Sequence, residues 1–173
     1  MRLYLIGMPG AGKTTLGRGL AVAYEVPFVD LDEEIVRHEG RSIPDIFAAE
    51  GEAYFRMREA AVLREVLAQH PKLVLATGGG TPCFHDNVEV LLETGITLYL
   101  DVPVAKLAGR VQAAAKTRPL LAALPDTDTL EAHLNETLHF RKQFYDRAPL
   151  RCQASACTVG AVRQLLARYE ASA

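Results

Sequence analysis

A glycine-rich segment near the start of the chain contains residues that can bind phosphate groups. Residues 7–14 read Gly-Met-Pro-Gly-Ala-Gly-Lys-Thr and match Gly-x-x-x-x-Gly-Lys-Thr, the P-loop pattern. Glycines let the backbone turn tightly and point several N–H groups at an anion, and a helix beginning at Lys13 adds the positive end of its dipole. Lys13 supplies a positive charge for the β- and γ-phosphates, and the Thr14 hydroxyl is placed to bind Mg²⁺. We therefore predict a nucleotide phosphate site rather than a simple glycine-rich turn.

Two carboxylates, Asp30 and Asp32, follow the next apolar segment. In extended backbone, residues two apart share a face, so both side chains would point into one crevice. Two carboxylates beside a polyphosphate repel it unless Mg²⁺ or a hydroxyl donor lies between them. We interpret one carboxylate as a partner of the metal and its waters, and the other as the partner of a substrate hydroxyl. The alternative, compatible with the first, is that one of them caps the helix predicted over residues 33–38.

Three consecutive glycines, Gly78, Gly79 and Gly80, follow an apolar strand predicted over residues 73–76. They expose bare backbone to the close approach of a ligand, whereas a plain turn needs only one glycine. This strand lacks the terminal aspartate of the usual Walker B pattern. The carboxylate for a metal must then come from elsewhere, and Asp30 is the obvious supplier.

Several arginines outside the P-loop are candidates for binding an anionic substrate, because the planar guanidinium can bind both oxygens of a carboxylate. Arg56 and Arg58 flank one helical position, so they point to different faces and at most one of them enters a shared site. Arg118, Arg141 and Arg147 lie later in the chain. Each arginine taken alone could equally be a solvated surface charge.

The elements that position these loops alternate between strands and helices. Apolar segments predict strands over residues 3–6, 26–32, 73–76 and 96–100, and a last short strand that ends near Thr158. Spacing and end signals predict helices that begin near residues 13, 33, 42, 55, 86, 103, 129 and 162. Continuous apolar strands between helices indicate an α/β fold with a parallel sheet covered on both faces. Ligands of such sheets collect at the carboxyl ends of the strands.

Length and composition exclude several classes of protein. The 173 residues fit a single domain, and 49% hydrophobic content indicates a globular chain. A net charge of −2 gives no reason to expect binding to nucleic acid or to a membrane surface, and no apolar run approaches the ~20 residues that cross a bilayer. The short apolar start is interpreted as a strand, not a signal peptide. Cys83, Cys152 and Cys157 lack metal-binding spacing and are expected to be reduced thiols of a cytoplasmic protein.

Six segments occur in a fixed order and together resemble one enzyme family. They are Gly-Met-Pro-Gly-Ala-Gly-Lys-Thr-Thr (7–15), Phe-Val-Asp-Leu-Asp (28–32), Gly-Arg-Ser-Ile-Pro-Asp-Ile-Phe (40–47), Gly-Glu-Ala-Tyr-Phe-Arg (51–56), Thr-Gly-Gly-Gly (77–80) and Arg-Pro-Leu-Leu (118–121). With them the chain resembles the shikimate kinases over nearly its whole length. The resemblance implies a three-layer, nucleoside-monophosphate-kinase-like P-loop fold with a five-stranded parallel sheet and a mobile lid, which matches the irregular stretch 113–128.

The resemblance also implies an activity, the ATP-dependent phosphorylation of the 3-hydroxyl of shikimate in aromatic amino-acid biosynthesis. Its products would be shikimate 3-phosphate and ADP, with Mg²⁺ as the cofactor. We expect the protein to bind only these small molecules, neither nucleic acid nor membrane, and to be a monomer.

Site residues carry over from the family position by position. The ATP phosphates would be bound by Gly10, Ala11, Gly12, Lys13, Thr14 and Thr15, with Arg118 as the lid arginine. Thr14 would ligate Mg²⁺, and Asp30 would act on it through water. Shikimate would be bound by Asp32, Arg56, Gly79 with its neighbours Gly78 and Gly80, and Arg141. The two catalytic assignments are Lys13, for the charge of the γ-phosphoryl group, and Asp32, which would orient the attacking hydroxyl and could accept its proton.

The late substrate arginine of the family has two candidates, because it usually lies in an Arg-x-Pro segment followed by an aromatic residue. Residues 141–145 read Arg-Lys-Gln-Phe-Tyr, which keeps an aromatic pair but has glutamine at the position of the proline. Residues 147–151 read Arg-Ala-Pro-Leu-Arg, which keeps the proline but has arginine in place of tyrosine. We favour Arg141 over Arg147, because its distance from Arg118 suits the family better.

Three other functions compete with this interpretation. Another small-metabolite kinase of the same fold, such as a gluconate kinase, would share the P-loop but has less reason for the paired aspartates, the glycines and the arginines. A GTP-dependent switch would want an Asn-Lys-x-Asp segment, and the chain has none, since Asn87 precedes Val and Asn135 precedes Glu. A nucleotide-binding module without catalysis would bind ATP yet show no shikimate-dependent turnover.

Overall fold

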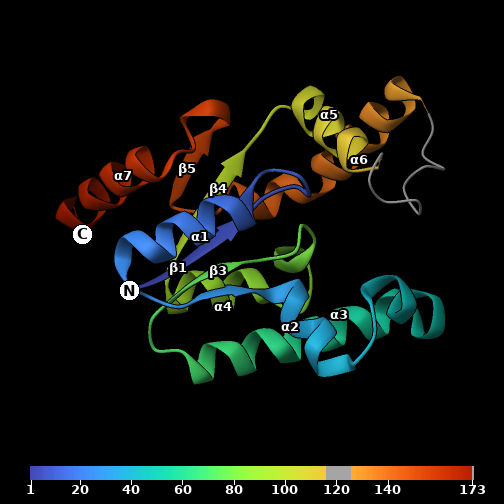
Figure 1. Ribbon diagram of the computed structural model, residues 1–173, viewed down its shortest axis with the longest axis horizontal. Helices are drawn as coiled ribbons and strands as arrows, with labels where there is room; N and C mark the ends of the chain where they lie inside the picture. Colours follow the sequence, from blue (N-terminus) through green and yellow to red (C-terminus); the bar gives the residue numbers. More distant parts are fainter. Residues whose placement is uncertain (116–125, 173) are drawn as a thin grey trace.

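The computed structural model describes residues 1–115 and 126–172, in which helices enclose a parallel five-stranded sheet (Figure 1). The strand order is β2-β3-β1-β4-β5, and every neighbouring pair is parallel. The strands are β1 (Arg2–Ile6), β2 (Phe28–Asp30), β3 (Leu73–Ala76), β4 (Ile96–Asp101) and β5 (Leu150–Gln153). The predicted α/β fold with a five-stranded parallel sheet is confirmed.

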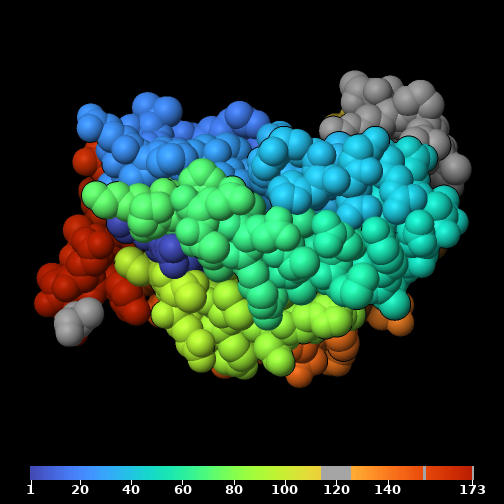
Figure 2. All heavy atoms as spheres, turned by 90° about the horizontal axis from the view of Figure 1, so that it is seen from below, coloured from blue at the N-terminus to red at the C-terminus, as the bar shows by residue number. Residues whose placement is uncertain are grey.

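Helices cover both faces of this sheet. They are α1 (Lys13–Tyr24), α2 (Leu31–Glu39), α3 (Ile43–Gln69), α4 (Asn87–Thr94), α5 (Val104–Ala115), α6 (Thr127–Tyr145) and α7 (Val159–Ser172), with short 3-10 turns η1 (Thr81–Cys83) and η3 (Ala154–Ala156). In Figure 1, α1 and α7 lie on one side of the sheet and α3 and α4 on the other. Figure 2 shows α3 running across the second face, between α2 and α4. The two described helices of at least 18 residues, α3 and α6, are not apolar enough to cross a membrane.

The sheet core explains the apolar strands of the sequence. Every residue of β3 is buried, and so are residues 3–6 of β1, because both strands lie inside the sheet with helices on each face. Pairing also fixes where these strands end: Ala76 lies in register with both Leu5 of β1 and Asp30 of β2. The loops that follow β1, β2 and β3 therefore leave the sheet side by side. This register brings together three segments that the sequence singles out.

Local signals start the helices that pack over β2 and β3. The Ser42 hydroxyl accepts a hydrogen bond from the N–H of Asp45 at 3.2 Å and donates one to its carboxylate at 2.6 Å, so Ser42 caps α3 at the helix start predicted near residue 42. Gly51 has a φ of 82° and kinks α3 between the helix starts predicted near residues 42 and 55.

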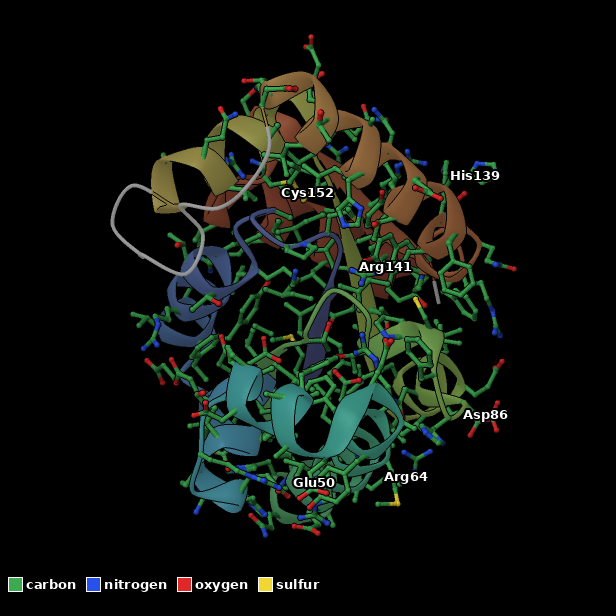
Figure 3. All side chains as sticks on the ribbon, turned by 90° about the vertical axis from the view of Figure 1, so that its right-hand side faces the viewer. Glu50, Arg64, Asp86, His139, Arg141 and Cys152 are labelled. Atoms are coloured by element: carbon green, nitrogen blue, oxygen red, sulfur yellow. A yellow bond between two sulfur atoms is a disulfide. The ribbon has the colours of Figure 1, made fainter. Side chains whose placement is uncertain are left out.

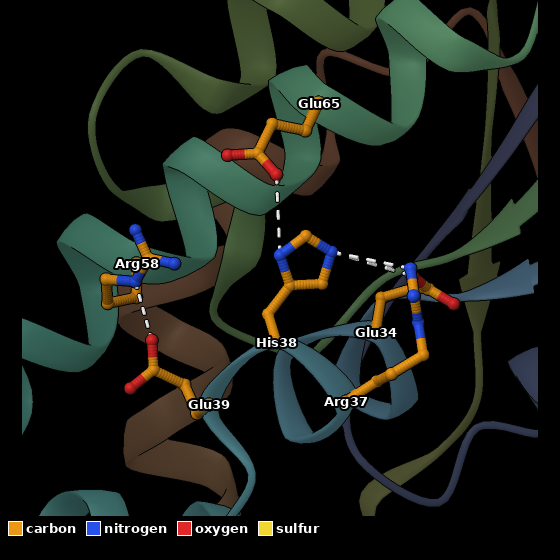
Figure 4. A network of polar contacts seen from close by, with 6 residues as sticks. All are labelled: Glu34, Arg37, His38, Glu39, Arg58 and Glu65. Carbon is orange, nitrogen blue, oxygen red and sulfur yellow. Dashed lines mark hydrogen bonds and ion pairs between the residues drawn. The ribbon is translucent and has the colours of Figure 1, made fainter.

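An ionic network joins α2 to the kinked helix α3 (Figure 4). Arg58 Nε donates to Glu39 Oε1 at 2.6 Å, and His38 Nδ1 lies 3.4 Å from Glu65 Oε2. Burial and these contacts hold α2 and α3 as one unit beside the carboxyl ends of β2 and β3.

Three expectations differ from the structure. The second strand is only Phe28–Asp30, because the backbone turns into α2 immediately after Asp30. Thr158 does not end a strand: β5 ends at Gln153, and the Thr158 hydroxyl accepts from the N–H of Ala161 at 3.2 Å at the start of α7. The stretch 113–128, expected to be irregular, has helix at both ends, because α5 continues to Ala115 and α6 begins at Thr127. Residues 116–125 of the expected lid lie outside the described residues.

The cysteine prediction is also wrong in part. Cys152 and Cys157 form a disulfide, with a Cα–Cα distance of 5.3 Å, whereas Cys83 is a free thiol. The η3 turn between them reverses the chain after β5 and brings the two side chains together.

Candidate active site

The P-loop connects β1 to α1 and leaves the first turn of that helix open to a ligand. Gly12 is the N-cap of α1 with a φ of 96°, and Gly10 has a φ of 80°. Residues other than glycine rarely adopt these backbone conformations. Within the part of the chain that the structure describes, no side chain caps the N–H groups of α1. They point out at the end of the helix that carries its partial positive charge, so they can bind phosphate oxygens.

Lys13 is held across this loop. Its Nζ donates to the carbonyl oxygens of Gly7 at 2.8 Å and Met8 at 2.9 Å, and only 8% of the residue is exposed. Burial lowers the pKa of Lys13 to about 8, with Arg141 contributing in the same direction and Asp32 opposing it. A desolvated ammonium group gains most from an anion placed beside it, which suits a phosphate ligand.

Asp30 both caps a helix and contacts the P-loop. One of its oxygens accepts from the N–H groups of Asp32 at 3.0 Å and Glu33 at 3.4 Å, and the other accepts from Thr14 Oγ1 at 2.7 Å. The two interpretations of Asp30 from the sequence are therefore compatible. The structure places the Thr14 hydroxyl against a carboxylate, and such hard oxygen donors are the ligands that Mg²⁺ prefers.

Protein ligands alone do not form a metal cage at this place. Among residues 1–115 and 126–172, no group of three or more His, Cys, Asp or Glu side chains could hold a metal ion. Mg²⁺ in kinases is usually bound through one or two protein groups together with phosphates and waters. Thr14 and Asp30 fit that description.

Asp32 has an unusual environment for an aspartate. Burial raises its pKa from 3.8 to about 6; Asp30 and Glu59 add to the rise, and Lys13 and Arg56 oppose it. A carboxylate with a pKa near 6 is ionised at neutral pH and can still accept a proton from a reacting hydroxyl. Asp32 also lies beside Lys13, on the side of the cleft that holds the P-loop.

The glycine segment 78–80 follows β3, and each of its residues contacts a different charged side chain. A Cβ at the first glycine would lie 3.0 Å from Asp32 Oδ1, at the second 2.7 Å from Arg141 Nη1, and at the third 2.5 Å from Arg56 Nη2. None of the three has a positive φ, so it is the close contacts and not the backbone conformation that favour glycine, most of all at Gly79, where a Cβ would also lie 2.7 Å from Pro9 Cδ. Three side chains that the sequence predicts in one site do meet here, on bare backbone.

Arg56 is anchored from two sides. Its Nη1 donates to Glu59 Oε1 at 2.9 Å, and its guanidinium lies 4.4 Å from the centre of the Phe84 ring. Glu59 is fully buried and also accepts from Thr81 Oγ1 at 2.7 Å. Arg58, two residues further along α3, pairs with Glu39 instead, which confirms that the two arginines point to different faces.

The structure separates the two candidates for the late arginine. Arg141 points from α6 toward the centre of the molecule, while His139 on the same helix points outward (Figure 3). Nη1 of Arg141 is buried and has no hydrogen-bond partner within the described part of the chain. Arg147 is exposed and pairs with Glu89 through both guanidinium nitrogens. A buried guanidinium nitrogen without a partner is suited to a carboxylate ligand, so the geometry favours Arg141.

The glycine segment lines one cavity, and a second cavity holds the two arginines that contact Gly79 and Gly80. The larger, about 1060 Å³, is lined by the P-loop, Asp30, Asp32 and Gly79. The smaller, about 360 Å³, is lined by residues of α3 and α6, including Arg56 and Arg141. The arrangement provides a phosphate-binding cleft beside a small pocket with two guanidinium groups.

Two residues of the site are not predicted from the sequence, and one predicted residue lies outside the described part of the chain. Glu59 and Arg110 were not identified, although Glu59 stands three residues after Arg56, a spacing that brings side chains together on a helix. Arg110 Nη1 donates to the carbonyl of Gly10 at 2.8 Å, a contact over 100 residues of chain that no local pattern indicates. Arg118 lies outside the described residues.

Comparison with known proteins points to one family. The family model "Shikimate kinase" matches residues 9–169. A shikimate kinase of Phocaeicola vulgatus is 42% identical over 147 residues, which are 85% of this chain and 83% of that protein. The crystal structure of shikimate kinase from Bacteroides thetaiotaomicron superposes with a TM-score of 0.84 at 32% identity, covering 98% of each chain. Shikimate kinase from Acinetobacter baumannii in complex with shikimate has a TM-score of 0.83 at 36% identity, covering 98% of this chain and 93% of that one.

The raised pKa of Asp32 predicts a stability effect of its removal. Because folding raises this pKa from 3.8 to about 6, the folded state binds more protons between these pH values, and ionised Asp32 opposes folding above pH 6. In the ligand-free protein, we expect Asp32→Asn to unfold with a free energy about 1–3 kcal/mol higher than that of the wild type at pH 7.5. The difference shrinks toward zero near pH 4. Urea denaturation across this pH range measures it.

The exposed residue Asp86 provides a control for the loss of one negative charge, because asparagine tolerates its left-handed backbone. Asp86→Asn should show no comparable gain at pH 7.5. A variant Asp32→Asn that is less stable than the wild type by the same amount at every pH would contradict the proposed burial effect.

Proposed function

The chain belongs to the shikimate kinase family, and we propose that it transfers the terminal phosphoryl group of ATP to the 3-hydroxyl of shikimate. The products are shikimate 3-phosphate and ADP, in the biosynthesis of aromatic amino acids. The observation that carries this proposal is the buried Nη1 of Arg141, which has no hydrogen-bond partner among the described residues; Arg141 lines a cavity with Arg56 and contacts Gly79, which Pro9 of the P-loop also contacts. It gives an acid with a carboxylate a binding pocket directly beside a phosphate site.

Phosphoryl transfer depends mainly on positioning and on neutralising charge. The N–H groups at the start of α1 and the Lys13 ammonium bind the phosphate oxygens of ATP, and Gly10, Ala11, Gly12 and Thr15 shape the cleft around them. Thr14 and Asp30 hold Mg²⁺, which offsets the negative charge of the phosphates when it is bound. Arg118 is proposed to reach ATP from the lid.

Asp32 acts on the acceptor. Its carboxylate orients the 3-hydroxyl, whose oxygen forms the new bond to the γ-phosphorus while the bond between that phosphorus and the departing ADP oxygen breaks. The hydroxyl proton passes to Asp32, whose pKa near 6 allows it to take the proton and release it again to water at neutral pH. Lys13, close to Asp32, remains on the phosphoryl oxygens during this step.

The guanidinium groups of Arg56 and Arg141 bind the carboxylate of shikimate, while Gly78, Gly79 and Gly80 let the acceptor approach the backbone. Glu59 and Phe84 hold Arg56 in this orientation. Burial of an ion pair strengthens it relative to water and penalises an acceptor without the carboxylate. We further propose that the enzyme works as a cytoplasmic monomer.

Release of ADP tests the function. With ATP and Mg²⁺ present, we expect ADP release to depend on shikimate and to show no comparable increase with gluconate, the acceptor of the rival kinase. A coupled assay for ADP measures both reactions on the same preparation. Release that is equal with and without shikimate would reject the proposed function, and release stimulated by gluconate would favour the rival.

The two late arginines provide a matched pair of variants. Loss of a buried ion pair with the substrate costs about 2–5 kcal/mol, so Arg141→Ala should raise the KM for shikimate by about 30-fold or more. Arg147→Ala removes only an exposed pair with Glu89 and should change this KM by less than about threefold. Steady-state kinetics at saturating ATP measures both. Similar KM values for the two variants would show that Arg141 does not bind the carboxylate.

A further inference from the structure

The disulfide between Cys152 and Cys157 lies next to the cleft that holds the P-loop. Cys152 is buried in β5, in register with Leu100 of β4 (Figure 3). Cys157 lies at the end of the η3 turn and is only half-buried. Leu100 and Cys157 both line the larger cavity. The bond therefore ties the wall of the cavity to the edge of the sheet.

The residues after Cys157 form the rest of this wall. Thr158 and Val159 line the same cavity as the P-loop. Thr158 starts α7 through its hydroxyl, which accepts from the N–H of Ala161. Val159 packs against α1, where a Cβ on Gly19 would lie 2.7 Å from Val159 Cγ2. The wall is thus held at one end by α7 on α1 and at the other by the disulfide.

We propose that Cys152 and Cys157 are a redox-modifiable site that sets the affinity of the cleft for nucleotide, the disulfide form binding it more tightly than the dithiol form. This inference rests on the proposed function only in taking ATP and ADP as the ligands of the larger cavity. A bond across a sequence separation of 5 restricts the segment between its ends, so the oxidised wall needs less ordering when a nucleotide binds. Reduction frees residues 153–156 from that restraint.

The reaction is thiol–disulfide exchange with a dithiol reductant. A thiolate of the reductant attacks Sγ of Cys157, the more exposed of the two sulfurs, and the Cys152–Cys157 bond breaks to release the Cys152 thiolate, which takes up a proton. The second thiol of the reductant, as its thiolate, then displaces Cys157 from the mixed disulfide, and this leaving thiolate is protonated in turn. Two electrons pass from the dithiol, which becomes a disulfide, to the protein, which gains two thiols.

The third cysteine gives an internal comparison. Cys83 lies after the glycine segment and does not line the larger cavity. Burial raises the pKa of its thiol to about 11, so little reactive thiolate forms at neutral pH. A redox response that involves the nucleotide should therefore depend on Cys152 and Cys157 and not on Cys83.

Binding of ADP, measured by calorimetry without shikimate, tests the proposal independently of turnover. Titration of unfolded protein should find one thiol per chain in the oxidised form and three after treatment with dithiothreitol. Reduction should raise the Kd for ADP and the KM for ATP by about 3- to 10-fold, while the KM for shikimate stays within about twofold. Re-oxidation should restore the original values.

Variants separate this site from a general effect of reduction. The double variant Cys152→Ser, Cys157→Ser should bind ADP as the reduced wild type does and should not respond to dithiothreitol, whereas Cys83→Ser should keep the full response. Three thiols in every preparation, an unchanged Kd for ADP on reduction, or an equal loss for ATP and shikimate would each overturn the proposal. The proposed function fails separately, if neither redox form shows shikimate-dependent ADP release.

Discussion

The close contact between bare backbone at residues 78–80 and three charged side chains is the constraint on which the site depends. Asp32, Arg56 and Arg141 come from α2, α3 and α6, and each approaches one glycine: a Cβ would be in tight contact with Asp32 and would collide with either arginine. Charged groups are costly to bury unless they are paired. Here Lys13, Arg56 and Glu59 are buried, and Asp32 and Arg141 are half-buried beside them, so opposite charges offset one another while Nη1 of Arg141 has no hydrogen-bond partner among the described residues.

Strand register supplies the second constraint, because it decides which loops share an edge. Ala76 pairs with both Leu5 and Asp30, so β1, β2 and β3 end at the same level. The P-loop therefore faces the glycine segment, and Thr14 of one loop meets Asp30 of the next at 2.7 Å. Donor and acceptor sites of a phosphotransferase must lie within bonding distance of each other, and this register places them side by side before any ligand binds.

The sequence predicts best what local spacing determines. The P-loop needs only a strand, a glycine-rich turn and a helix in succession, and all three follow from short patterns. The two roles of Asp30 could not be separated in the sequence, because both use the same carboxylate and its second oxygen reaches Thr14 only after folding. Arg141 and Arg147 each keep a different part of the family's segment; what distinguishes them in the folded chain is Glu89 of α4, which pairs with Arg147 at the surface.

Contacts that form only in the folded chain were missed. Arg110 contacts Gly10 from a helix 100 residues away in sequence, and Cys152 meets Cys157 only because η3 reverses the chain after β5. The expectation of reduced thiols rested on the absence of a metal-binding pattern, which says nothing about such a turn. The prediction that a strand ends at Thr158 is wrong for another reason: threonine is equally suited to the end of a strand and to the cap of a helix.

If the glycines act through the charged side chains that lie on them, a double-mutant cycle between Gly80 and Arg56 should show strong coupling. The three atoms nearest to a Cβ at Gly80 would all belong to the Arg56 guanidinium, at 2.5 to 2.8 Å. We predict that Gly80→Ala lowers kcat/KM for shikimate by about tenfold or more in the wild type, but by less than about threefold when Arg56 is already alanine. An equal loss of kcat/KM in both backgrounds, with both proteins folded, would show that Gly80 does not act through Arg56.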